Sequence, residues 1–326
     1  MLNLHQTIMN SKLAVHKPVD PINKSVTLLL LASSMAVFAG RAYQHFYYDI
    51  PIRIVLWDQN VMEDVLLNVF NIPWDEFIRS SEWDSRIQST VRTIGLVYFC
   101  CFAWCTQFTF RKSVRCARIL LVGAAFLFFL AVLYSLDRFG RVGELMEYTC
   151  QWFAPIALFL MLRGGNSLLI GWGLRMTVAL TFAGHGLYAT GYYPIPGNFI
   201  DMAILGFGVN EDTAVRILAV AGWLDFLIAI LIWFPATDRF AAFYAFLWGA
   251  VTAMARIWTN FDVQFIDESM SQWLFETVVR IPNALLPLAI FLFRQRVSQV
   301  TEGKFMNGNS NRESDRSFVW WMSKTY

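Results

Sequence analysis

Long apolar stretches, separated by short charged segments, follow one another along most of the chain. Each is close to the ~20 residues that an α-helix needs to cross about 30 Å of hydrocarbon. The pattern therefore predicts an all-α, polytopic membrane protein with about eight transmembrane helices. The predicted spans are Val26–Tyr43, Thr93–Phe110, Ile119–Tyr134, Tyr148–Leu162, Ser167–Tyr188, Ile217–Phe234, Phe240–Trp258 and Trp273–Phe293.

Composition and charge add an orientation. Hydrophobic residues make up 56% and charged residues 15% of the 326 residues, against about 45–50% and about 25% in ordinary proteins, which excludes a typical soluble globular protein. With a cytoplasmic amino terminus, 15 of the 26 Lys and Arg residues fall on the cytoplasmic side, accompanied by five acidic residues. Because orientation follows the Lys and Arg bias, both termini are predicted to be cytoplasmic.

An internal repeat divides the chain. The segments from Phe38 to Pro51 and from Phe182 to Pro196 both read Phe-Ala-Gly, a basic residue, tyrosines, and then Tyr-Tyr-x-Ile-Pro. Four predicted spans separate them, so the two copies run in the same direction, related by an axis along the membrane normal. We therefore predict two parallel four-helix halves at 25–163 and 164–296, preceded by a cytoplasmic segment at 1–24 and followed by a cytoplasmic polar tail at 297–326.

Each half carries an outer segment after its Tyr-Tyr-x-Ile-Pro sequence. The long insert at 52–90 is predicted to contain an amphipathic helix from Asn60 to Phe70, lying at the outer interface. Its counterpart in the second half runs from Asn198 to Leu205. The residues that share the apolar face of the first helix are Val61, Met62, Val65, Leu66 and Val69.

Two ionisable residues lie deepest within the spans. Counting along the helices places Arg175 and Asp225 at nearly the same depth, so we predict an ion pair between them. Such a pair is either a structural clamp or part of a functional site. The repeat equivalent of Asp225 is Cys101, so a site there exists in one half only.

A second set of charged and imidazole side chains is predicted near the outer ends of the spans. It could hold an anionic head group, a quinone carbonyl or a carboxylate through charge-assisted hydrogen bonds. The alternative is that each arginine extends to the interface without binding a ligand. Arg41 and His185 are the best candidates because both directly follow Phe-Ala-Gly. The set is Arg41, His45, His185, Arg256, Glu276 and Arg280.

Other chemistry has little support. The sequence contains no nucleophile elbow, phosphate loop or His-Glu-x-x-His motif, so catalytic residues are not assigned. His45 and His185 lack a histidine four residues away, which disfavours haem, and no metal site is predicted. The five cysteines form no Cys-x-x-Cys pair and are interpreted as small apolar groups.

The second half resembles the DoxX-like family of four-helix membrane proteins. The resemblance rests on Phe182-Ala183-Gly184-His185, Gly222-Trp223-Leu224-Asp225-Phe226, Pro235-Ala236-Thr237-Asp238-Arg239 and Ala253-Met254-Ala255-Arg256. His185, Asp225, Thr237 and Arg239 fill the family's basic, acidic and turn positions, although the acid there is usually Glu. More faintly, Gly40 to His45 is similar to the gamma-carboxylase-like transmembrane group.

The resemblance implies a subunit in a bacterial inner membrane that binds a quinone or lipid head group in a redox or envelope-associated complex. It implies a protein partner or a homo-oligomer, and no nucleic acid. Two alternatives remain. A structural subunit could anchor a larger complex, and a small-solute transporter would fit the two-half layout. Against transport, no span carries paired Gly or Pro at mid-membrane.

Overall fold

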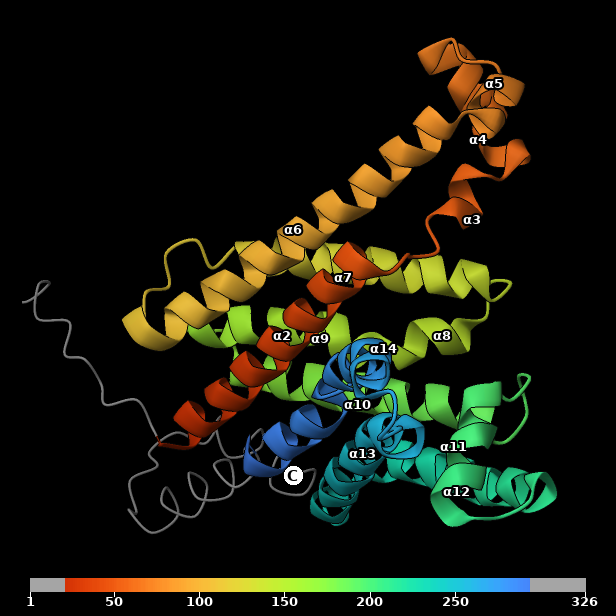
Figure 1. Cartoon of the computed structure of the whole chain (residues 1–326). Coiled ribbons are helices and arrows are strands. Elements are labelled where there is room, and N and C mark those ends of the chain that lie inside the picture. The colour runs from red at the N-terminus through yellow and green to blue at the C-terminus, as the bar shows by residue number, and fades with distance from the viewer. Residues whose placement is uncertain (1–20, 294–326) are drawn as a thin grey trace, which may run out of the picture.

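The computed structural model describes residues 21–293, and every regular element in this part of the chain is a helix (Figure 1). Eight helical segments are long and apolar enough to cross a membrane, which confirms the predicted polytopic all-α fold. Most of the predicted segment 1–24 and all of the tail 297–326 lie outside the described residues. The spans are α2 (Pro21–Tyr47), α6 (Ser81–Arg111), α7 (Ile119–Asp137), α8 with α9 (Val142–Glu147 and Thr149–Leu162), α10 (Ser167–Ala189), α12 (Glu211–Leu231), α13 (Asp238–Asn260), and α14 (Ile266–Val278) with a helix at 282–293.

The fourth and eighth spans are each interrupted by a turn, which the sequence analysis did not predict. In the fourth span, α8 ends at Glu147 and α9 begins at Thr149, whose hydroxyl donates to the carbonyl of Met146 at 2.8 Å. In the eighth span, a turn follows α14 and the next helix begins at Pro282, which has no N–H to donate. The absence of paired Gly or Pro therefore does not exclude broken spans.

Equivalent helices of the two predicted halves make equivalent packing contacts. In both, the first span lies against the second, α2 against α6 and α10 against α12. A Cβ on Gly40 would lie 2.5 Å from Val279 in the eighth span, and one on Gly184 would lie 2.9 Å from the Gly143 carbonyl in the fourth. Each Phe-Ala-Gly glycine thus brings the first span of one half against the last span of the other, as small residues do in membrane helix packing.

The long insert forms a helical cluster at the far end of α6 (Figure 1). It comprises α3 (Arg53–Leu56), α4 (Gln59–Val65), the π-helix η1 (Leu66–Phe70) and α5 (Trp74–Arg79). The predicted helix from Asn60 forms as α4 continuing into η1, but its apolar face is divided. Leu66 is buried, whereas Val61 and Val69 are exposed. We call the side of the bundle that carries this insert the outer side.

The second outer segment forms as predicted. It is α11 (Gly197–Phe207), and it ends where Gly208 adopts a left-handed conformation at φ 65°. The next span, α12, begins after Asn210, whose side chain accepts a hydrogen bond from the Thr213 amide at 2.9 Å. Because α11 packs on both α12 and α13, it covers the outer end of the second half.

Candidate functional site

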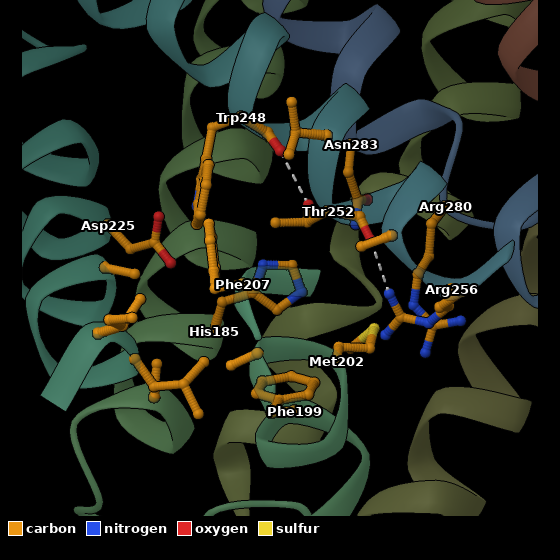
Figure 2. A pocket seen from close by; sticks show the side chains of 17 residues that line it. His185, Phe199, Met202, Phe207, Asp225, Trp248, Thr252, Arg256, Arg280 and Asn283 are labelled. Carbon is orange, nitrogen blue, oxygen red and sulfur yellow. Dashed lines mark hydrogen bonds between the residues drawn. The ribbon is translucent and has the colours of Figure 1, made fainter. Parts of the chain in front are cut away.

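An apolar cavity of about 150 Å³ lies beneath α11. Figure 2 shows its lining side chains, with Asp225 at one end and Arg256 and Arg280 at the other. Phe207 and Val251 line this cavity and are also exposed on the surface of the bundle. The described residues that line it all belong to the second predicted half: His185, Ala189, Phe199, Met202, Ala203, Phe207, Ile217, Leu218, Ala221, Asp225, Trp248, Val251, Thr252, Ala255, Arg256, Arg280 and Asn283.

A second cavity, of about 350 Å³, is polar and adjoins the first on the outer side. Unlike the apolar cavity, it is lined by residues from both predicted halves, including the outer ends of the fourth and eighth spans. Three arginines and three glutamates face it, so no single sign of charge dominates. These charged residues are Arg138, Glu144, Glu147, Arg256, Glu276 and Arg280.

Arg256, Arg280 and Phe199 line both cavities and mark the boundary between them. Arg280 hydrogen-bonds the Glu276 carboxylate, and Arg256 Nε lies 3.9 Å from the same carboxylate. A further hydrogen bond joins Arg256 Nη1 to the Thr252 carbonyl at 3.0 Å. One carboxylate thus lies close to two guanidinium groups.

The interruptions in the fourth and eighth spans position this site. Glu147 is the last residue of α8, and Arg280 lies in the turn after α14. Asn283 follows that turn, is 4% exposed and has no hydrogen-bond partner at Oδ1 among the described residues. Interruptions of this kind leave polar groups free to line a cavity, and both interruptions do so here.

His185 lies where the two halves meet. It is on the wall of the apolar cavity, and its Nε2 is 4.0 Å from Oε1 of Glu147. This approach is possible because the preceding residue, Gly184, lets α10 pack closely against the α8 backbone. The structure thus brings together three of the predicted ligand-binding residues, His185, Arg256 and Arg280.

The predicted ion pair between Arg175 and Asp225 is wrong. Arg175 Nη2 lies 3.2 Å from Oδ2 of Asp238, the first residue of α13. The reason is the direction of side chains, which tilt toward the amino terminus of their own helix. Since α10 begins on the inner side and α12 on the outer side, Arg175 extends inward and Asp225 outward.

Asp225 instead contributes to the apolar cavity. Its side chain is a hydrogen-bonding neighbour of Trp248, while Oδ1 is buried without a hydrogen-bond partner among residues 21–293. The repeat-equivalent Cys101 is fully buried, and a Cβ on Gly123 would lie only 2.9 Å from its Sγ. That position in the first half is therefore tightly packed.

The structure places Arg41 and His45 elsewhere. Neither lines the two cavities described here. Arg41 is 2% exposed and donates to Gln44 at 2.5 Å and to Gln151 at 2.6 Å. Its guanidinium group also lies 5.2 Å from the ring centroid of Tyr148, on the wall of the polar cavity. His45 Nδ1 lies 2.7 Å from the Arg41 carbonyl. Arg41 thus contacts a side chain of the cavity wall without lining the cavity itself.

Several lining residues were not predicted. Glu144 and Glu147 look like ordinary interfacial acids in the sequence, and Asn283 carries no motif. Of the family-like turn residues, Thr237 hydrogen-bonds the Leu231 carbonyl at 2.8 Å and Arg239 is exposed, so neither reaches the cavities.

In the described part of the chain, no three His, Cys, Asp or Glu residues gather as a metal site.

The cysteines are free thiols. Cys101, Cys105 and Cys150 are buried, and Cys100 and Cys116 are exposed.

Comparison with known proteins adds no relative, because no protein-family model, curated protein or solved structure matches this chain. The geometry of the two adjoining cavities is therefore the basis for assigning a function.

Proposed function

We propose that this membrane protein binds an amphiphile, with its head group held by Arg256 and Arg280 and its apolar body in the adjoining cavity. The observation that carries the proposal is that the same two arginines line an apolar and a polar cavity. An amphiphile has the same division between a polar and an apolar part. Guanidinium groups favour an anionic or carbonyl oxygen, as in a lipid head group or a quinone.

Access from the membrane supports the proposal. Phe207 on α11 and Val251 on α13 line the apolar cavity, and 63% and 58% of their surfaces are exposed. On a membrane-spanning bundle, such exposed apolar side chains face lipid. A membrane amphiphile could therefore enter sideways without passing through water, while the polar cavity admits its head group.

The DoxX-like resemblance is part of this proposal. Two of its motif residues, His185 and Asp225, contribute to the apolar cavity, so the motif and the cavity point to the same region of the chain. We orient the outer side away from the cytoplasm on the Lys and Arg bias. A role as a subunit of a redox or envelope-associated complex in a bacterial inner membrane is proposed from the resemblance alone.

The proposal is tested by extracting what co-purifies with the protein. Wild type, Arg256→Gln and the exposed control Arg239→Gln are purified in mild detergent, and bound lipids and quinones are quantified by mass spectrometry. We expect one enriched amphiphile in wild type and in the control, and a loss of about tenfold or more in Arg256→Gln, as for the loss of a charged hydrogen bond. Equal recovery from all three proteins would overturn the proposal.

A second candidate, transport of a small solute, is favoured by the interrupted fourth and eighth spans. Transporters bind substrates where such discontinuous helices meet at a repeat interface, and here Glu147 and Arg280 at the interruptions share the polar cavity. Substrate-dependent flux into reconstituted vesicles, lost in Arg280→Gln, would favour transport. Binding of an amphiphile without any flux would favour the first proposal.

A further inference from the structure

Among the described residues that line the apolar cavity, Asp225 is the one that carries an acidic group. It is 3% exposed, and its Oδ1 has no hydrogen-bond partner within the described chain. Figure 2 shows the carboxyl group among the lining side chains, at the end of the cavity opposite Arg256 and Arg280. This position requires a physical explanation, because an unsatisfied buried polar group costs about 1–3 kcal/mol.

No residue in the described part of the chain supplies the missing partner. Trp248 has a single indole N–H, which can satisfy only one of the two carboxyl oxygens. The arginine predicted to pair with Asp225 is held by Asp238 instead. A polar group that is buried, unpartnered and directed into a cavity is typical of a ligand contact.

The side chains between the two ends of the cavity indicate the chemistry of the middle part of a bound molecule. The wall there is formed mainly by aliphatic, aromatic and thioether side chains, and the polar exceptions between the ends are His185, Thr252 and Asn283. The hydroxyl of Thr252 already donates to the Trp248 carbonyl at 2.9 Å, so most of the wall accommodates hydrocarbon. Residues of this kind on the wall include Met202, Phe207, Leu218, Ala221 and Val251.

We propose that the occupant carries a hydroxyl group on the end opposite its head group, and that this hydroxyl hydrogen-bonds Asp225. A hydroxyl fits because it can donate to a carboxylate and accept from a carboxylic acid. An ammonium group fits less well, since a single carboxylate in an apolar cavity compensates poorly for the loss of its hydration. The ligand class is therefore a hydroxylated amphiphile. This inference rests on the proposed head-group site at Arg256 and Arg280.

The test compares chain-matched probes that differ only in the terminal hydroxyl. Octanoic, decanoic and dodecanoic acids are paired with their ω-hydroxy derivatives, and binding to the full-length protein in lipid nanodiscs is measured by equilibrium dialysis, with empty nanodiscs subtracted. For the chain length that fits best, we expect the hydroxyl to increase wild-type affinity about fivefold or more, as for a typical hydrogen bond. In Asp225→Leu the two acids should bind within about twofold of each other.

Further variants distinguish the possible failures. Asp201→Leu, at an exposed position on α11, should keep the wild-type preference. Asp225→Ala removes the carboxyl group without adding a bulky side chain, and it should also bring the two acids within about twofold of each other, even if Asp225→Leu folds poorly. If Arg256→Gln weakens both acids but the hydroxyl has no effect in wild type, this inference is overturned and the proposed function stands. If neither acid binds to wild type, this inference is overturned. If both acids bind but Arg256→Gln binds them as wild type does, the proposed head-group site is overturned with it.

Discussion

Arg256 and Arg280 come from different spans, yet both approach the carboxylate of Glu276 and both line the same two cavities. Each arginine alone resembles an interfacial residue extending toward water. Together they form a fixed pair of guanidinium groups between an apolar and a polar cavity. This relationship underlies the proposal that the bundle holds the head group of an amphiphile.

The Arg175–Asp238 ion pair is expected to stabilise the inner side of the second half. Both side chains are largely buried, so solvent screens their mutual attraction only weakly. In a double-mutant cycle of Arg175→Leu with Asp238→Asn, measured by unfolding in bicelles, we expect an interaction energy of about 1–3 kcal/mol. The matched cycle of Arg175→Leu with Asp225→Leu should be additive within about 0.5 kcal/mol. The reverse pattern would restore the pairing expected from helix depth.

Gly184 packs so closely against the fourth span that we expect even an alanine side chain at this position to destabilise the protein. A Cβ there would lie 2.9 Å from both the Glu147 amide nitrogen and the Gly143 carbonyl, which are backbone atoms and cannot move aside independently. Gly184→Ala should therefore cost about 1–3 kcal/mol of stability and displace Glu147 in the polar cavity. The control is Gly206→Ala, where the nearest atom is 3.6 Å away. It should be neutral, or stabilising by up to about 1 kcal/mol. Equal stability of the two variants would contradict the packing described here.

These results show which parts of the fold can be predicted from sequence. The spans could be located because their apolar length is set by the bilayer, independently of tertiary contacts. The partner of Arg175 could not be predicted in this way. Counting residues along a helix gives the depth of a residue but ignores the direction in which its side chain leaves the helix. The interruption before Pro282 carries a sequence signal in the proline itself. The interruption at Tyr148 has no comparable signal.

The candidate site was predicted only in part. His185 was found through the repeat and the family-like motif, and Arg256 and Arg280 through their charge near the end of a span. The same reasoning selected Arg41, but Arg41 donates to Gln44 and Gln151 instead of facing either cavity. Those partners come from tertiary packing, which residue type and spacing do not specify.

The proposed orientation can be tested at a cysteine outside the spans. Cys116 is exposed in the inner connection between α6 and α7. In a Cys100→Ala background, a membrane-impermeant maleimide should label Cys116 only after the membrane is permeabilised. In contrast, Asn198→Cys on α11 should be labelled in intact cells or spheroplasts. Labelling of Cys116 without permeabilisation would reverse the orientation predicted from the Lys and Arg bias.

The central claim is tested most directly by photo-crosslinking from within the site. Phe199 lines both cavities, so p-benzoylphenylalanine in its place should react with the bound amphiphile. The control has the same photoreactive residue in place of Phe240, which is 64% exposed. We predict one dominant adduct at Phe199 by mass spectrometry, lost in Arg256→Gln, and a mixture of bulk lipids at Phe240 that this variant does not change. The same lipid mixture at both positions, unaffected by Arg256→Gln, would contradict a specific amphiphile site.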